Sequence, residues 1–397
     1  MFDKPENGLI EGIAPKKISH ESPVTAREFK PWHKPRKQWV RNNQWLKEIK
    51  ALIPHLRLDG RSLRYLSLPG EDMLDIRVLA HLCNEKGLQL KCLGFDEEAR
   101  DRTSQTEVNI SRNEISNNIQ PGSVIVTDNI SVLKSTDSQG FNYIRGHGPF
   151  DIVNLDLCGS ISCINFPDNH QVLHNLCEYQ INNSREKWLL FLTTRAEYEQ
   201  VNVAHLPHYL KCLKNNSESN SLFGQRLVEM SNWDFTRYNE SVNVDEVLVG
   251  CRDREFVKLF AAGFGKWLIQ LFYDTNNNWL VEMLDSCWYR VENNQTPVSF
   301  PNMLSLAFLF SPVNVPINDK SGLSLKNPEP HINEQSLAMG ILDQTERFRD
   351  IDQEVDADPH LWSSLVEENA ILLKTARYQV DLYPQWAEEK RIRFDAN

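Results

Sequence analysis

Residues 88–96 read Leu-Gln-Leu-Lys-Cys-Leu-Gly-Phe-Asp, an apolar run that ends in a glycine and an acidic residue. An apolar run of this length, bounded by polar and turn residues, is typical of a buried strand. A similar run occupies residues 63–68, and between the two runs apolar residues recur at helical spacing from Met73 to Leu82. The order strand, helix, strand predicts two parallel strands joined by a crossover helix.

The same alternation continues along the chain, with further apolar runs at residues 122–127, 150–155 and 188–193. It predicts an α/β fold in which a mostly parallel sheet is covered by helices on both faces. Such sheets bind ligands at the carboxyl ends of their strands, beside the first strand. After a long apolar helix at 254–273, the apolar runs at 279–291 and 303–310 predict an antiparallel pair at the edge of the sheet.

The composition agrees with a globular protein of two or three domains, or with one α/β domain carrying appendages. The chain has 397 residues, of which 41% are hydrophobic and 24% are charged. No apolar stretch approaches the roughly 20 residues that cross a bilayer, so we expect no membrane segment. The eight cysteines show no CxxC spacing, which favours reduced thiols in a cytoplasmic protein.

One group of cysteines and histidines has a spacing that bears on metal binding. His170, His174 and Cys177 lie at helical spacing and follow Cys158 and Cys163. Structural zinc sites usually show tighter spacing of their ligands. We therefore interpret the group as one flank of a helix and predict no metal site.

Residues 1–58 are predicted to form a basic, aromatic arm followed by a helix. Residues 27–50 contain eight basic residues against two acidic ones, and two prolines are expected to keep the first part extended. Aromatic rings that alternate with cations suit base stacking and phosphate contact. The residues predicted to bind nucleic acid are Lys30, Trp32, Lys34, Arg36, Lys37, Trp39 and Arg41. The alternative is a strap, in which the tryptophans anchor the segment to the domain and the cations face water.

Residues 313–397 are predicted to be a linker followed by an acidic helical tail. Pro, Asn and Ser are frequent after residue 311, and acidic residues dominate positions 350–358, which we expect to repel one another and stay extended. Residues 360–378 then have the apolar periodicity of a helix. Such a helix needs a surface to cover its apolar face, either on its own domain or on a protein partner or second copy.

The order of elements in residues 59–312, with an acidic residue after the second strand and a terminal antiparallel pair, resembles the class I S-adenosylmethionine-dependent methyltransferases. The resemblance implies a Rossmann-like, doubly wound fold and S-adenosylmethionine as cofactor. Of the glycine-rich turn that follows the first strand in that family, only Gly70 is present, while Ser67 stands where the family often has an acid and Pro69 departs from the pattern. Asp96 matches the acid that binds the ribose hydroxyls, and Asp128 matches the residue that meets the adenine amino group. Helix capping is the alternative for both.

The resemblance also implies which residues lie near the methyl acceptor. They are Asp156 and Cys158, at the end of the fourth predicted strand and in the loop after it. Methyltransferases of amino groups have two prolines and an aromatic residue after such an acid, and this chain does not, which disfavours methylation of adenine or cytosine amino groups. RNA cytosine-5 methyltransferases have a nucleophilic cysteine shortly after the acid, and Cys158 comes one residue too early for that motif. A packed loop thiol is the alternative for Cys158.

No phosphate-binding GxxxxGK[ST] loop, GxSxG elbow, HExxH pair or GxGxxG turn follows any predicted strand. Kinase, ATPase, hydrolase and standard dinucleotide oxidoreductase functions are thereby disfavoured, and the resemblance implies a methyltransferase acting on nucleic acid or on a nucleic-acid-bound substrate. The alternative function is a catalytically inactive, methyltransferase-like binding subunit of a multiprotein complex, for example in bacterial defence. The reduced glycine turn favours the alternative, and Asp96 favours the enzyme.

Overall fold

A computed structural model of the chain describes residues 27–97, 101–163, 168–201, 204–239, 243–274, 279–291, 300–313, 333–392 and 394. Its strands are β1 (Leu63–Ser67), β2 (Leu90–Phe95), β3 (Val124–Val126), β4 (Ile152–Asp156), β5 (Trp188–Arg195), β6 (Trp279–Met283), β7 (Cys287–Tyr289), β8 (Met303–Pro312) and β9 (Arg349–Asp350).

The strands of these residues form one nine-stranded sheet in the order β3-β2-β1-β4-β5-β8-β7-β9, with β6 also paired to β8. Strands β1 to β5 are parallel, and β8 runs antiparallel to β5, β6 and β7. The predicted fold class, a mostly parallel Rossmann-like sheet with an antiparallel edge, is confirmed. All five parallel strands lie where the apolar runs predict them.

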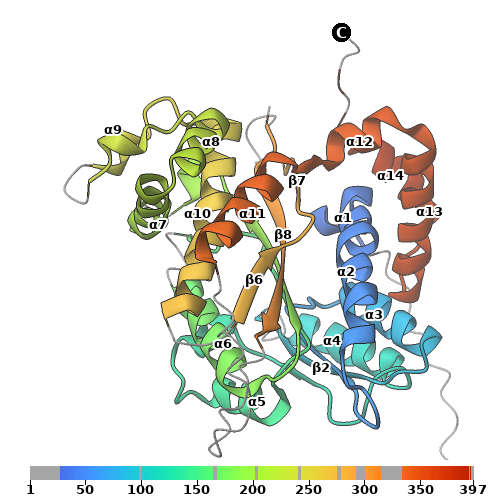
Figure 1. Cartoon of the computed structure of the whole chain (residues 1–397). Helices are drawn as coiled ribbons and strands as arrows, with labels where there is room; N and C mark the ends of the chain where they lie inside the picture. The colour runs from blue at the N-terminus through green and yellow to red at the C-terminus, as the bar shows by residue number, and fades with distance from the viewer. Residues whose placement is uncertain are drawn as a thin grey trace, which may run out of the picture.

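Helices cover both faces of the sheet (Figure 1). They are α1 (Pro35–Val40), the π-helix η2 (Arg41–Leu46), α2 (Lys47–Leu52), α3 (Leu74–Glu85), α4 (Arg102–Ile115), α5 (Gln139–His147), α6 (Asp168–Asn183), α7 (Leu206–Ser219), α8 (Ser221–Ser231), α9 (Val244–Val247), α10 (Asp253–Asp274), α11 (Glu334–Glu346), α12 (Ile351–Ala357), α13 (Pro359–Thr375) and α14 (Tyr383–Glu389). Short 3₁₀ turns are η1 (Pro31–His33), η3 (Ile53–His55), η5 (Ile130–Lys134), η6 (Tyr198–Gln200) and η7 (Phe235–Arg237).

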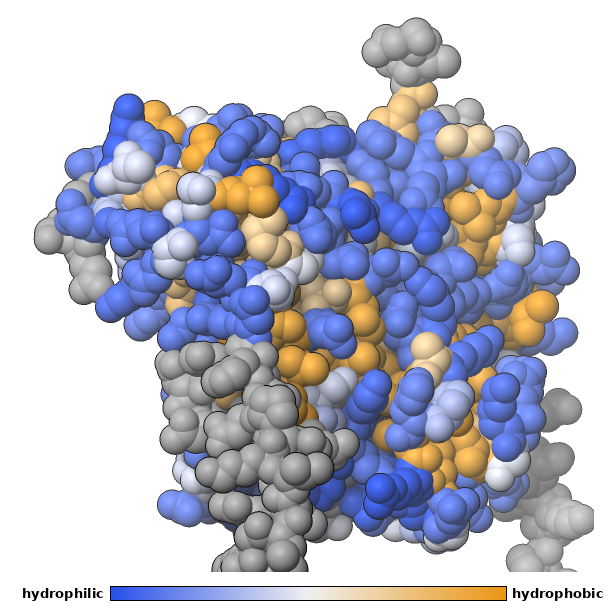
Figure 2. Space-filling view, viewed as in Figure 1, coloured by the Kyte–Doolittle hydropathy of each residue, from blue (hydrophilic) through white to orange (hydrophobic). Residues whose placement is uncertain are grey.

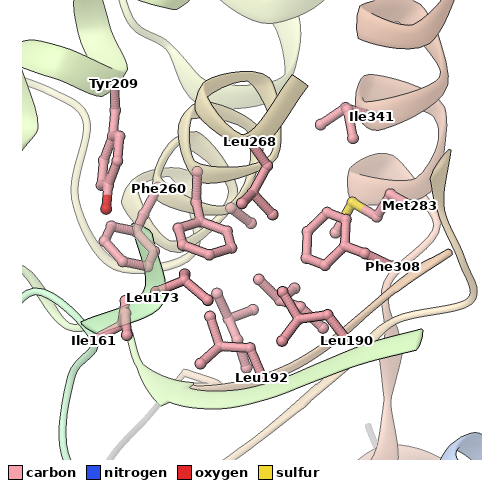
Figure 3. Packing of buried hydrophobic residues seen from close by; sticks show 14 of the residues in the cluster. Ile161, Leu173, Leu190, Leu192, Tyr209, Phe260, Leu268, Met283, Phe308 and Ile341 are labelled. Atoms are coloured by element: carbon pink, nitrogen blue, oxygen red, sulfur yellow. The ribbon is translucent and has the colours of Figure 1, made fainter. Parts of the chain in front are cut away.

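Alternate residues of each strand supply two separate hydrophobic cores. In β5, Leu190 and Leu192 pack in the core beneath α6, α7, α10 and α11, whose residues appear in Figure 3. Leu189 and Phe191 pack in the opposite core with the N-terminal helices and α3. This division follows from the two-residue period of a strand, which sends successive side chains to opposite faces.

Residues 31–55 are helical and largely buried, so the prediction that the first part of this stretch is extended is wrong, while residues 1–26 of the predicted arm lie outside the described residues. Pro31 and Pro35 begin η1 and α1, positions at which proline loses no hydrogen bond and its fixed φ suits a helix. Trp39 is 3% and Trp45 is 4% exposed, and both belong to the core on this side of the sheet. Of the tryptophans that the strap alternative takes as anchors, Trp39 is therefore in the core, whereas Trp32 is exposed.

In the C-terminal region, helices α12 and α13 pack on the same side as the N-terminal helices. Helix α13, predicted from its periodicity, lies beside α1 (Figure 1), and Asn369 donates a hydrogen bond to the backbone oxygen of His33 at 2.6 Å. The acidic run 350–358 is not extended as predicted but forms α12, because Asp350 caps this helix and Asp352 is paired with cations. Helix α11 occupies part of the predicted linker and packs against α10, where a Cβ on Gly265 would lie 2.9 Å from Ile341.

The face seen in Figure 2 is mostly hydrophilic, with small, separate hydrophobic patches. Among the helices in the described part of the chain, none is long and apolar enough to cross a membrane.

Helix α13 offers a test of this local docking. Leu373 is fully buried in a cluster with Leu74, Tyr378 and Tyr383, whereas Ile371, two residues away, is 62% exposed. We expect Leu373→Ala to lower the free energy of unfolding by about 2–5 kcal/mol, because it removes buried methyl groups and leaves a cavity. Ile371→Ala is the matched control and should change it by less than about 0.5 kcal/mol. Equal effects of the two substitutions in urea unfolding would contradict the packing of this helix.

Candidate functional site

A pocket of about 840 Å³ lies at the carboxyl ends of the parallel strands. Residues at or after the ends of β1, β2, β3, β4 and β5 line it, as do residues of the N-terminal helices and of β7 and β8. Its charged lining residues are Lys34, Arg36, Lys37, Arg41, Glu71, Asp72, Asp75, Asp96, Glu97, Asp156, Arg195 and Arg290. The pocket is therefore at the edge of the sheet that the sequence predicts, but it is walled by the segment that was expected to extend from the domain.

The turn after β1 leaves backbone open to the pocket. Gly70 has φ of +60°, a conformation that glycine adopts without strain, and a Cβ built there would meet no atom within 4 Å. At the end of β2, a Cβ on Gly94 would lie 2.6 Å from Ile125 and 2.9 Å from Pro69. Pro69, which departs from the family pattern, thus packs over a glycine of the neighbouring strand.

Asp96 follows β2, lines the pocket and is 6% exposed. Its backbone N–H donates to the oxygen of Val126 at 3.0 Å, which continues the pairing of β2 with β3. Helix α4 begins at Arg102, so Asp96 does not cap that helix.

The other predicted cofactor residues lie beside the pocket. Asp128 is half-buried and is not a lining residue; Asn129 and Ile130 line the pocket instead, and it is Asn129 that caps the 3₁₀ turn η5. Ser67 is 1% exposed within the sheet and does not line the pocket. Of the predicted cofactor set, the structure brings Gly70 and Asp96 together.

The predicted acceptor residues Asp156 and Cys158 both line the pocket. Asp156 ends β4, and its carboxylate is 2.5 Å from the ammonium of Lys37. Cys158 is exposed in the loop that follows. The sequence predicts nucleic-acid binding for Lys37 and gives no sign of this pair, because its members are 119 positions apart.

Four of the basic residues predicted to bind nucleic acid are withdrawn from solvent. Lys34, Arg36, Lys37 and Arg41 are between 4% and 8% exposed, and all four line the pocket. Trp32 is exposed and also lines the pocket, while the pocket lining includes neither the half-buried Lys30 nor the buried Trp39. Binding of nucleic acid by these residues stays a prediction, but the exposed basic surface that it assumed is replaced by a pocket wall.

Two carboxylates of the C-terminal region hold cations at this wall. Arg36 is 3.0 Å from Asp352, and Arg290 is 3.2 Å from Asp350 and 3.4 Å from Asp352. All four side chains are less than 10% exposed. Charges withdrawn from water in this way must be paired, so these contacts fix the position of α1 relative to β7 and α12.

A second ionic cluster holds the turn after β1. Asp72 is 2.8 Å from Arg27 and 3.2 Å from Nε2 of His33, and it accepts a hydrogen bond from Tyr378 at 2.9 Å. Burial alone would raise the pKa of Asp72, but the hydrogen bond from His33 and the charge of Arg27 outweigh it, so this pKa is lowered. Burial lowers the pKa of His33 despite the nearby carboxylate. The ring accepts from Lys30 N–H at Nδ1, which agrees with a neutral imidazole that donates from Nε2.

The cysteines and histidines at 158–177 do not converge. In the residues that the structure describes, no group of three or more His, Cys, Asp or Glu side chains could hold a metal ion. The ring centroids of His170 and Trp267 are 4.2 Å apart, and Cys177 is buried in the hydrophobic core.

Comparison with known proteins places the chain in a family. The model of the PP_RS20740-like family matches residues 26–388. The chain belongs to this family. No curated protein matches the chain.

Two solved structures are similar to the chain at low identity. An rRNA methylase from Streptococcus thermophilus is 10% identical, with a TM-score of 0.29, and the match covers 73% of this chain and all of that one. DszA carbon methyltransferase is 10% identical, with a TM-score of 0.30, and the match covers 70% of this chain and 53% of that one. These two likenesses are too low to support an argument about the fold. The fold is described from the strand order of the sheet given above.

The neutral state of His33 predicts a pH dependence of stability. Its pKa in the folded protein is below the value of about 6.5 expected for the unfolded chain, so the unfolded state binds more protons as the pH falls. Stability should therefore be fully present above pH 6.5 and decrease below it. We expect His33→Gln, whose amide can donate and accept but does not titrate, to lose less stability than the wild type between pH 7 and pH 5 in urea unfolding. Parallel pH profiles of the two proteins would contradict a neutral, buried His33.

Proposed function

We propose that the chain binds S-adenosylmethionine across the tips of β1 and β2 and transfers its methyl group to an acceptor beside Asp156. The observation that supports this most directly is that a single pocket joins Gly70, Asp96 and Asp156, which lie at or after the ends of the three neighbouring strands β1, β2 and β4. Ligands of open α/β sheets bind at this edge, where the strand order reverses beside the first strand.

The residues present fit the cofactor. The open backbone at Gly70 leaves room for close approach of a ligand, and its lack of a Cβ allows the φ of +60°. Asp96 offers a carboxylate at the second strand tip, a group suited to two ribose hydroxyls because charge-assisted hydrogen bonds are stronger than neutral ones. The volume of about 840 Å³ lies in the range of roughly 300–1,000 Å³ typical of small-molecule sites.

On the acceptor side, the chain's own residues provide position and exclusion of water. The bound cofactor supplies an activated methyl group, and the transfer needs the acceptor atom held in line with it. Asp156 and Lys37 form a polar pair at this side of the pocket, and Trp45, Tyr289 and Met303 supply apolar lining. A buried wall of this kind limits the acceptor's freedom, which is where most of the rate acceleration would arise.

Nucleic acid, the acceptor that the sequence predicts, would have to reach the cations of this wall from inside the pocket. Of the seven residues predicted to bind it, Trp32 is the exposed one. The alternative, an inactive binding subunit, would transfer no methyl group, whether or not it binds the cofactor.

Asp96 provides the test of the cofactor site. We expect calorimetry to detect binding of S-adenosylmethionine and S-adenosylhomocysteine by the wild type. Asp96→Ala should weaken both at least tenfold, because about 1.5–3 kcal/mol of charge-assisted hydrogen bonding is lost. Asp137→Ala, at an exposed position that does not line the pocket, is the control and should bind as the wild type does.

Two outcomes would count against the proposal. Absence of heat with the wild type at millimolar cofactor would refute a cofactor site. Unchanged affinity of Asp96→Ala would show that this carboxylate does not contact the ribose.

A further inference from the structure

Arg41 is a buried cation of the pocket wall that lacks a carboxylate partner. It begins the π-helix η2, lines the pocket and is 4% exposed. Its Nη atoms make two long hydrogen bonds of 3.4 Å, to Oε1 of Gln38 and to the backbone oxygen of Trp32, and its Nε has no acceptor. No carboxylate of the described residues lies within salt-bridge distance of its guanidinium.

Other cations at the same pocket are paired. Lys37 contacts Asp156 at 2.5 Å, Arg36 contacts Asp352 at 3.0 Å, and Arg195 contacts Glu197 at 2.9 Å. Removing a guanidinium from water is unfavourable unless an anion compensates it. Burial is also the main reason why the pKa of Arg41 is lowered from its ordinary value, although an arginine remains charged at neutral pH. Arg41 therefore differs from Lys37, Arg36 and Arg195 in having no carboxylate within salt-bridge distance among the described residues.

The surroundings of Arg41 place it on the acceptor side. Asp156, at the tip of β4, and Tyr289, in β7, are among the charged or ionisable groups that act on it, as are Asp75 and Tyr383. Lys37 and Trp45, one turn before and one turn after Arg41, also line the pocket, and the Lys37 ammonium lies 4.8 Å from the Trp45 ring. Lys37, Arg41 and Trp45 therefore line the part of the pocket near Asp156, where we place the methyl acceptor. Gly70 and Asp96, where we place the cofactor, lie at the tips of β1 and β2.

We propose that Arg41 binds a carboxylate of the methyl acceptor, which makes the acceptor an anionic small molecule enclosed by the pocket. The inference rests on the proposed function and names the substrate class for the same site. A guanidinium matches a carboxylate in two parallel hydrogen bonds. The carboxylates of Asp75 and Asp156 nearby favour a ligand of one negative charge over a doubly charged phosphate, because like charges repel in a poorly solvated site.

The chemistry of the wall suggests a matched pair of probes. Trp45, Tyr289 and Met303 offer apolar and aromatic surface beside the guanidinium. Benzoate and benzamide have similar shapes and differ in charge, so their comparison isolates the carboxylate. In calorimetry with saturating S-adenosylhomocysteine, we expect the wild type to bind benzoate at least tenfold more tightly than benzamide, and more tightly than phenyl phosphate.

Substitutions of Arg41 then test the assignment. Arg41→Gln should abolish the preference for benzoate, and Arg41→Lys should keep part of it, because an ammonium retains the charge but not the paired geometry. Arg57→Gln, at a side chain 92% exposed, is the control and should keep the full preference. A preference that survives in Arg41→Gln, or one for phenyl phosphate in the wild type, would overturn the proposal.

The cofactor's own amino-acid carboxylate is the other source of the same chemistry. The affinities for S-adenosylhomocysteine and for 5′-methylthioadenosine, which lacks the amino-acid group, distinguish the two sources. If Arg41 serves the acceptor, Arg41→Gln binds both as the wild type does. Weaker binding of S-adenosylhomocysteine alone would assign Arg41 to the cofactor and overturn the proposal.

Two further measurements distinguish this proposal from a failure of the proposed function and from a purely structural role of Arg41. If the wild type binds no S-adenosylhomocysteine, the proposed function fails, and the benzoate and benzamide comparison without cofactor still decides the role of Arg41. Unliganded Arg41→Gln should melt no lower than the wild type, because an uncompensated buried charge is removed. A clearly lower melting temperature, shared by Arg41→Lys, would show that Arg41 stabilises the fold and does not serve a ligand.

Discussion

The buried ion pairs of Arg36 and Arg290 with Asp350 and Asp352 hold together three parts of the chain that are far apart in sequence. The backbone N–H of Arg290 also donates to Asp352 at 2.6 Å, so this carboxylate is held from the residue that follows β7 as well as from α1. Such pairs contribute little net stability when complete, but removal of one partner leaves a buried charge, which is strongly unfavourable. The N-terminal helix, the last strands and the acidic segment are therefore positioned as one unit.

That unit determines where the N-terminal helix meets the sheet. One side of the continuous helix α1–η2–α2 places Trp39 and Ile49 in the hydrophobic core, while another side places Lys37 and Arg41 at the pocket. The π-helix in its middle changes the usual spacing of side chains just where Arg41 begins it, and short π segments of this kind are frequent at functional sites. The anchoring of the helix and the lining of the pocket are thus two consequences of a single docking geometry.

The sheet could be predicted from the sequence because its determinants are local. Each strand is an apolar run, and the positions of Gly70 and Asp96 follow from the ends of two such runs. The pocket wall could not be predicted in this way. Lysine and arginine are usually exposed, and only partners that are distant in sequence make their burial favourable. Lys37 and Asp156 are 119 residues apart, and no spacing in the sequence indicates that they meet.

The conformation of the acidic segment, residues 350–358, likewise could not be predicted from its local sequence. Five acidic residues at alternate positions from 350 to 358 suggest mutual repulsion, yet the segment folds into β9 and α12. Four of the five carboxylates are paired with arginines, and Asp350 and Asp358 cap the helices that follow them. Local charge patterns therefore predict conformation poorly where the opposite charges come from elsewhere in the chain.

Electrostatic compensation also distinguishes structural from functional charge in this wall. Arg36, Lys37 and Arg290 each have a carboxylate within 3.2 Å, so their burial is explained by the folded chain itself. The burial of Arg41 is not explained by any carboxylate in the described part of the chain. Sequences that fold well satisfy their polar groups almost everywhere, and the exceptions concentrate at sites where a ligand completes the set. A buried guanidinium that has no salt-bridge partner among the described residues, in a pocket at the tips of parallel strands, is such an exception.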